Sequence, residues 1–151
     1  MKRNLDPMKE ILITSGSIWA LDNFARAFIN PGDEVLVFEP FFPVYTHFIS
    51  LSGGKIVPVQ LRVREGATGE NSNDWTFDGI EMESKINRKT KMIWLNNPNN
   101  PIGKVYTLEE LTFIGYLAQK HNLIILSDEA AQWYIYDKLE HIRIGDLGQF
   151  N

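Results

Sequence analysis

The sequence predicts an α/β protein: a three-layer α/β/α sandwich with a mostly parallel sheet. Short apolar runs typical of buried strands alternate with longer segments in which apolar residues recur at helical spacing. Glycine, proline and asparagine mark the loops between these runs. The chain has 151 residues, which fits one domain, and a fold of this size buries roughly 68 to 70% of its unfolded surface.

The composition excludes several classes of protein. Hydrophobic residues make up 44% and charged residues 23%, as in ordinary soluble globular proteins. The net charge is -4 and no polybasic patch is present, so we expect no nucleic-acid partner. The chain has no cysteine and three scattered histidines, so we expect no disulfide and no metal site. No apolar run has membrane-spanning length, so we expect no membrane partner and a cytoplasmic location, with mitochondria left open.

The first predicted unit is a strand over residues 11–14, a tight turn and a helix. The backbone N–H groups at the start of a helix favour a phosphate, so Gly16, Ser17 and Ile18 are candidate phosphate contacts. An ordinary turn in which a serine caps the helix stays open as an alternative. A dinucleotide site is disfavoured, because it needs three glycines at fixed spacing and the turn has one.

The second predicted unit begins with a strand over residues 34–38 and brings two aromatic side chains, Phe41 and Phe42, to its end. An aromatic face there could stack on a planar heteroaromatic ring, which contributes about 0.5 to 1.5 kcal/mol beyond burial of area. One of the two rings is expected to belong to the core. A helix over residues 44–51 and a strand over residues 55–61 follow.

Residues 62–73 are charged and show no regular spacing of apolar residues, which predicts a surface loop. Asp78 and Glu81 have the spacing of a capping box, which opens a helix that continues to Ile86. A buried strand over residues 91–95 is expected next.

Residues 96–103 hold four asparagines, two prolines and a glycine, and they follow a predicted strand directly. Ligands bind at the carboxyl ends of the strands of open α/β sheets, so Asn96 and Asn100 are candidate ligand contacts. The alternative is that these asparagines only satisfy the hydrogen bonds of their own turn.

The last predicted unit is the longest helix, which a capping box of Thr107 and Glu110 opens. One face of it is predicted to pack in the core, through Leu108, Leu111, Ile114, Leu117 and Ala118. The strand over residues 123–127 then ends at Asp128, whose carboxylate is solvated, caps a helix or contacts a ligand.

The loop over residues 96–103 resembles the Asn-x-Pro-x-Asn-Pro-Thr-Gly signature of the fold-type I pyridoxal-phosphate aminotransferases, with Ile102 where the family usually has threonine. Three further matches follow in the family's order, namely Thr14-Ser15-Gly16-Ser17, Glu39-Pro40-Phe41-Phe42 and Ser127-Asp128-Glu129. With Gly103-Lys104-Val105-Tyr106-Thr107, they are most similar to the branch of kynurenine aminotransferase, glutamine transaminase K and cysteine-S-conjugate beta-lyase. The similarity runs from about Leu5 to Ile144.

The resemblance implies pyridoxal phosphate as the cofactor and a role for each matched residue. Asp128 would hold the pyridinium, Asn100 the 3-oxygen, Asn96 the edge of substrate or cofactor, Phe42 the ring face, and Gly16, Ser17 and Ile18 the phosphate. The complete enzyme would be a homodimer. It would move an amino group from an aromatic or sulfur-containing amino acid, such as kynurenine or glutamine, to a 2-oxo acid.

The chain departs from the family at two places. The lysine that forms the Schiff base lies roughly 30 to 40 residues beyond the aspartate in the family, and Lys138, the only lysine after Asp128, lacks its sequence context. The family's tyrosine donor to the 3-oxygen is replaced by Ala131. We therefore expect residues 1–151 to be a partial large domain without the N-terminal segment, the small C-terminal domain or a catalytic residue. A non-catalytic protein that dimerises or binds phosphate, and an incomplete gene model, stay open.

Overall fold

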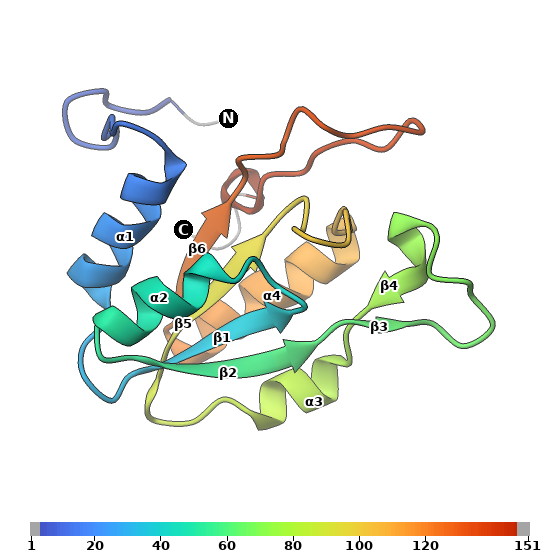
Figure 1. Cartoon of the computed structure of the whole chain (residues 1–151), viewed down its shortest axis with the longest axis horizontal. Coiled ribbons are helices and arrows are strands. Elements are labelled where there is room, and N and C mark those ends of the chain that lie inside the picture. The colour runs from blue at the N-terminus through green and yellow to red at the C-terminus, as the bar shows by residue number, and fades with distance from the viewer. Residues whose placement is uncertain (1–3, 148–151) are drawn as a thin grey trace.

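A computed structural model of the chain describes residues 4–147, so residues 1–3 and 148–151 of the predicted domain lie outside the described residues. Helices and strands alternate over most of the chain, as predicted (Figure 1). The elements are α1 (Ser17–Phe28), β1 (Glu34–Glu39), α2 (Val44–Leu51), β2 (Lys55–Gln60), β3 (Arg62–Val63), η1 (Ser72–Asp74), β4 (Trp75–Thr76), α3 (Gly79–Ser84), β5 (Thr90–Asn96), α4 (Leu108–His121), β6 (Ile124–Asp128) and η2 (Ile144–Asp146).

The main sheet has four strands in the order β2-β1-β5-β6, and each neighbouring pair is parallel. The predicted parallel α/β fold is therefore confirmed. Because all four strands run the same way, their carboxyl ends lie at one edge of the sheet. Asn96 at the end of β5 is in register with Asp128 at the end of β6, so two predicted site residues are neighbours across the sheet.

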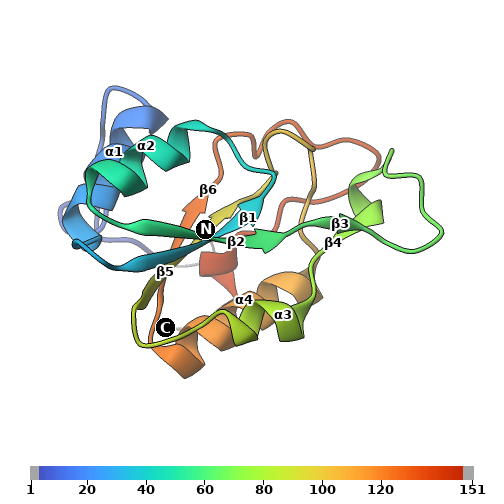
Figure 2. The ribbon, with the colours of Figure 1, turned by 60° about the horizontal axis from the view of Figure 1, so that its bottom comes forward.

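The helices form two outer layers, with α1 and α2 on one face of the sheet and α3 and α4 on the other (Figure 2). Successive strand residues point to opposite faces. Val35 and Val37 of β1 pack in the cluster that contains the buried residues of α1 and α2, whereas Leu36 and Phe38 pack in the cluster that contains those of α4. Each face thus has its own apolar core, as a three-layer sandwich requires.

The longest helix, α4, begins as its sequence predicts. The Thr107 hydroxyl accepts from the Glu110 backbone N–H at 3.2 Å, and the Glu110 carboxylate accepts from the Thr107 N–H at 2.9 Å, which completes the capping box. Four of the five predicted core residues are buried. The prediction was wrong for Leu108, which is 49% exposed, because the first residue of the helix lies beyond the edge of the core.

Four predictions of local structure were wrong. Residues 11–14 form no strand, because no strand of the described chain lies beside them, and they are mostly exposed. The predicted loop over residues 62–73 contains β3, which pairs with β4 in a small antiparallel hairpin. Helix α3 ends at Ser84 rather than at Ile86. Asp78 does cap α3, since its side chain accepts from two backbone N–H groups, but no reciprocal bond from Glu81 completes a capping box.

Candidate functional site

A cavity of about 120 Å³ lies where the carboxyl ends of β5 and β6 meet the starts of α1 and α2. Six of the seven predicted site residues line it: Ser17, Ile18, Phe42, Asn96, Asn100 and Asp128. The seventh, Gly16, precedes Ser17 as the N-cap of α1. Four lining residues were not among the predicted site residues: Leu21, Tyr45, Ala130 and Ala131. Segments that are more than 100 residues apart in the chain therefore meet in one site.

The start of α1 presents backbone donors to this cavity. Its N-cap is Gly16, with φ of 143° and ψ of 166°, a conformation that favours glycine. No side chain caps the helix, so the alternative of a serine cap is wrong. The first N–H groups of a helix have no partner within it. The exposed Ser17 and Ile18 therefore carry donors suited to an anion.

The Asp128 carboxylate is held at both oxygens. The Tyr45 hydroxyl donates to Oδ2 at 2.6 Å, and the Ala130 backbone N–H donates to Oδ1 at 3.1 Å. No helix follows β6 directly, so the alternative that Asp128 caps a helix is wrong. An ionised carboxylate has about four acceptor positions, and the two that remain allow it to accept from a ligand in the cavity.

The asparagines of the loop after β5 divide into two groups. Asn97 and Asn99 are buried and use both ends of their amides on backbone groups, so their role is structural. The alternative that they satisfy only their own turn is wrong, because Asn97 donates to the Ile142 carbonyl and Asn99 to the Pro40 carbonyl, both in distant segments. Asn96 lines the cavity but also shapes the loop, because its Oδ1 accepts from the Asn100 N–H at 2.6 Å and its Nδ2 donates to the Asp128 carbonyl at 3.0 Å. The exposed Asn100 lines the cavity as well. A ligand role for Asn96 and Asn100 stays a prediction.

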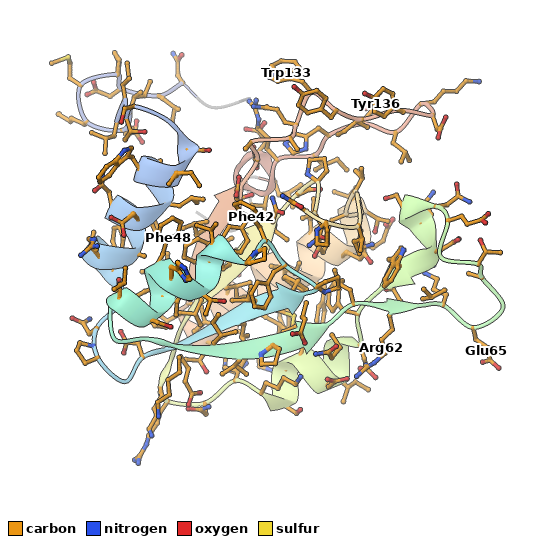
Figure 3. All side chains as sticks on the ribbon, viewed as in Figure 1. Phe42, Phe48, Arg62, Glu65, Trp133 and Tyr136 are labelled. Atoms are coloured by element: carbon orange, nitrogen blue, oxygen red, sulfur yellow. The ribbon has the colours of Figure 1, made fainter. Side chains whose placement is uncertain are left out.

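The aromatic wall of the cavity comes from Phe42, which lies just before α2 (Figure 3). Both Phe41 and Phe42 pack against the core cluster beneath α1 and α2, but only Phe42 also lines the cavity. The ring of Phe42 meets the ring of Tyr45 edge-on, with centroids 5.8 Å apart and an interplanar angle of 86°.

Tyr45 lines the cavity and bonds to Asp128, but it was not among the site residues that the sequence predicted. It is 1% exposed, and burial raises the pKa of its hydroxyl, an effect that the negative charge of Asp128 increases. The signal in the sequence was weak: an aromatic residue three positions after Phe42, at the start of a helix, belongs on the same side as that ring.

No lysine lines the cavity in the described part of the chain. Lys138 is exposed in a turn, with φ of 61°. Lys104 is fully buried, and its ammonium lies 2.9 Å from a Glu110 carboxylate oxygen and 2.7 Å from the Trp75 carbonyl oxygen. Burial lowers the pKa of Lys104, and Glu110 opposes this shift. Lys104 therefore has a structural partner and no access to the site.

Within residues 4–147, no group of three or more histidine, cysteine or acidic residues is arranged to hold a metal ion. Among the same residues, no helix is long and apolar enough to cross a membrane.

Comparison with known proteins identifies related chains. A family model described as aminotransferase class I and II matches residues 2–147. Kynurenine–oxoglutarate transaminase 1 of Mus musculus is 40% identical over 147 residues, which are 96% of this chain and 35% of the mouse protein. The chain thus spans about a third of the length of the curated relatives it matches.

Solved structures share the fold. The crystal structure of Bna3p from Saccharomyces cerevisiae matches with a TM-score of 0.84 and 40% identity, over 91% of this chain and 32% of that chain. Cystalysin from Treponema denticola, whose crystal structure contains pyridoxal 5'-phosphate, matches with a TM-score of 0.80 and 26% identity, over 90% of this chain and 33% of that chain.

Proposed function

Because the chain belongs to the class I and II aminotransferases, we propose that it is the pyridoxal-phosphate-binding part of an enzyme that transfers amino groups. The observation that carries this proposal is the meeting of a helix start, an aromatic ring and a carboxylate at one cavity. These are the three kinds of group that a phosphorylated, planar, basic ring requires: donors for the phosphate, a flat face for the ring, and an anion for the ring nitrogen.

The residues of the cavity fit the cofactor at each end. Ser17 and Ile18 would bind the phosphate through N–H groups that no side chain caps. Phe42 would cover one face of the ring and exclude water from it. Asp128 would accept a hydrogen bond from the protonated ring nitrogen, with an acceptor position that neither Tyr45 nor Ala130 uses.

The bound cofactor would supply an electron sink for the carbanion of the amino-acid substrate. The role of Asp128 would be to keep a proton on the ring nitrogen, because a carboxylate next to that nitrogen stabilises its charged form. Asn100, which lines the cavity as Ala131 does, would donate to the 3-oxygen. The loss of the family's tyrosine at Ala131 removes a second donor there and leaves this end of the site more open.

The substrates are proposed from the relatives. The mouse protein is named as a kynurenine–oxoglutarate transaminase, which supports an aromatic or sulfur-containing amino acid, such as kynurenine or glutamine, and a 2-oxo acid for the enzyme to which this domain belongs. We further propose that residues 1–151 form a partial large domain, and that the complete enzyme is a homodimer. The lysine that bonds to the cofactor would then be supplied by chain beyond this domain.

The proposal is tested by titrating the purified chain with pyridoxal phosphate and following the fluorescence of the cofactor. We expect weak, reversible binding, for which inorganic phosphate competes. Pyridoxal, which lacks the phosphate, should bind more weakly. This comparison distinguishes binding in the cavity from reaction with surface lysines, which react with the aldehyde of either compound. If pyridoxal phosphate binds no better than pyridoxal and phosphate does not displace it, the proposed site is wrong.

A further inference from the structure

Tyr45 and Asp128 are 83 residues apart in the chain, yet the Tyr45 hydroxyl donates to Asp128 Oδ2 at 2.6 Å. The bond ties the first turn of α2 to the carboxyl end of β6. Because burial and the nearby carboxylate both raise the pKa of Tyr45, its phenol keeps its proton at neutral pH. The direction of the bond is therefore settled: Tyr45 donates and Asp128 accepts.

Aromatic packing fixes the position of the Tyr45 hydroxyl. The Tyr45 ring is tilted against Trp94 of the central strand β5, with centroids 5.0 Å apart, and stacks on Phe41 at 6.4 Å. The Trp94 indole N–H is buried and makes no hydrogen bond of normal geometry. It lies near the Tyr45 hydroxyl and opposes part of the rise in the pKa of Tyr45. The tyrosine cannot turn away without opening this close-packed core.

We propose that Tyr45 is a positioning residue that aligns both the carboxylate and the aromatic wall of the cavity with a bound pyridine ring. This inference rests on the proposed function. The Tyr45 hydroxyl anchors one oxygen of Asp128 while the Ala130 N–H anchors the other, so the carboxylate has one orientation. The same tyrosine ring packs edge-to-face with Phe42. Tyr45 thus sets the position of Asp128, which would contact the nitrogen of the pyridine ring, relative to Phe42, which would cover the face of that ring.

A hydrogen bond from a neutral hydroxyl also stabilises the negative charge of the carboxylate. The contribution of Tyr45 should therefore depend on whether the ligand carries a ring nitrogen. Pyridoxine 5'-phosphate has the nitrogen and lacks the aldehyde that reacts with lysines. Its 1-deaza analogue, in which carbon replaces that nitrogen, keeps the phosphate and the flat ring. The two ligands differ only at the atom that Asp128 would contact.

The experiment measures the affinity of both ligands for the chain and for Tyr45→Phe, which keeps the packed ring and removes only the hydroxyl. We expect Tyr45→Phe to weaken binding of pyridoxine phosphate about tenfold and to change binding of the deaza analogue less than about twofold. When Asp128 is also replaced by asparagine, Tyr45→Phe should change the affinities for the two ligands by the same factor, because the negative charge that the hydroxyl stabilises is absent. The comparison of Asp128→Asn with and without Tyr45→Phe tests the role of the hydroxyl even if Tyr45→Phe lowers the melting temperature of the chain.

Tyr106→Phe is the matched control. Tyr106 is also 1% exposed, but it packs in the other core cluster and its hydroxyl has no hydrogen-bond partner within residues 4–147. Both affinities should therefore stay unchanged. Equal weakening of both ligands by Tyr45→Phe would overturn the positioning role and leave the proposed function standing. Failure of wild type to bind either ligand would instead overturn the proposed function, and the role of Tyr45 with it.

Discussion

Replacement of Asp128 by alanine tests the ring end of the site most sharply. The substitution removes the carboxylate that lies between Tyr45 and the cavity. It therefore has two separable consequences: a ligand loses its partner for the ring nitrogen, and the Tyr45 hydroxyl loses its acceptor in a buried setting. We expect lower affinity for pyridoxal phosphate and lower stability of the free chain.

Both magnitudes follow from the hydrogen bonds involved. A bond between a carboxylate and a charged donor contributes about 1.5 to 3 kcal/mol, which corresponds to a loss of affinity of about 10- to 150-fold. Asp128 is only partly buried and one wall of the cavity is the small Ala131, so water can replace the lost partner and the lower end is expected. An unsatisfied buried hydroxyl at Tyr45 costs about 1 to 3 kcal/mol of unfolding free energy.

The assay is a fluorescence titration with pyridoxal phosphate, accompanied by urea unfolding of each variant. Asp128→Asn keeps an acceptor for Tyr45 and removes the charge, so it should lower affinity with a smaller loss of stability. Glu140→Ala removes an exposed carboxylate elsewhere on the segment after β6 and serves as the control. Unchanged affinity in Asp128→Ala, with the predicted loss of stability, would mean that the ring nitrogen does not lie at Asp128.

Three further predictions concern the rest of the chain. Glu110→Ala should lower the unfolding free energy by about 3 to 5 kcal/mol in urea titration, because it leaves the Lys104 ammonium buried without its counter-ion; a loss below about 1 kcal/mol would contradict this. Arg62 and Lys85 lower the pKa of Glu81 from 4.5 to about 2. Since the folded pKa is the lower one, stability should fall as pH drops from 4.5 toward 2, and melting of Glu81→Gln should show a shallower fall, more so at low salt. The isolated chain should not convert kynurenine and 2-oxoglutarate in the presence of pyridoxal phosphate, since no lysine lines the cavity within residues 4–147; product formation by the purified chain would refute this.

Most of the fold could be predicted because local and long-range signals agree. The capping box at Thr107 and the apolar period of α4 point to one helix in one place. Every strand of the parallel sheet is a short apolar run that ends in polar residues, and those ends gather at one edge. The position of Asp128 beside Asn96 therefore follows from the parallel register, once the two strands are neighbours.

What the sequence could not predict depends on contacts between distant segments. The apolar run at residues 11–14 has the composition of a strand, but a strand needs a neighbour, and none lies beside it in the described chain. The hairpin of β3 and β4 joins residues with no periodic pattern. The sequence alone indicates only that Tyr45 is an aromatic core residue of α2. Its bond to Asp128 becomes visible only when the order β2-β1-β5-β6 brings α2 over the end of β6.

We propose that pyridoxal phosphate occupies the cavity at the ends of β5 and β6, with its phosphate at the start of α1. Chemical-shift mapping of backbone amides by NMR tests it directly. Inorganic phosphate alone should shift Ser17 and Ile18, and pyridoxal phosphate should in addition shift Asn100 and Ala130. Binding at this place is contradicted if the largest shifts fall instead around another cavity, of about 220 Å³, which is lined by Gln132, Trp133, His141, Arg143 and Asp146.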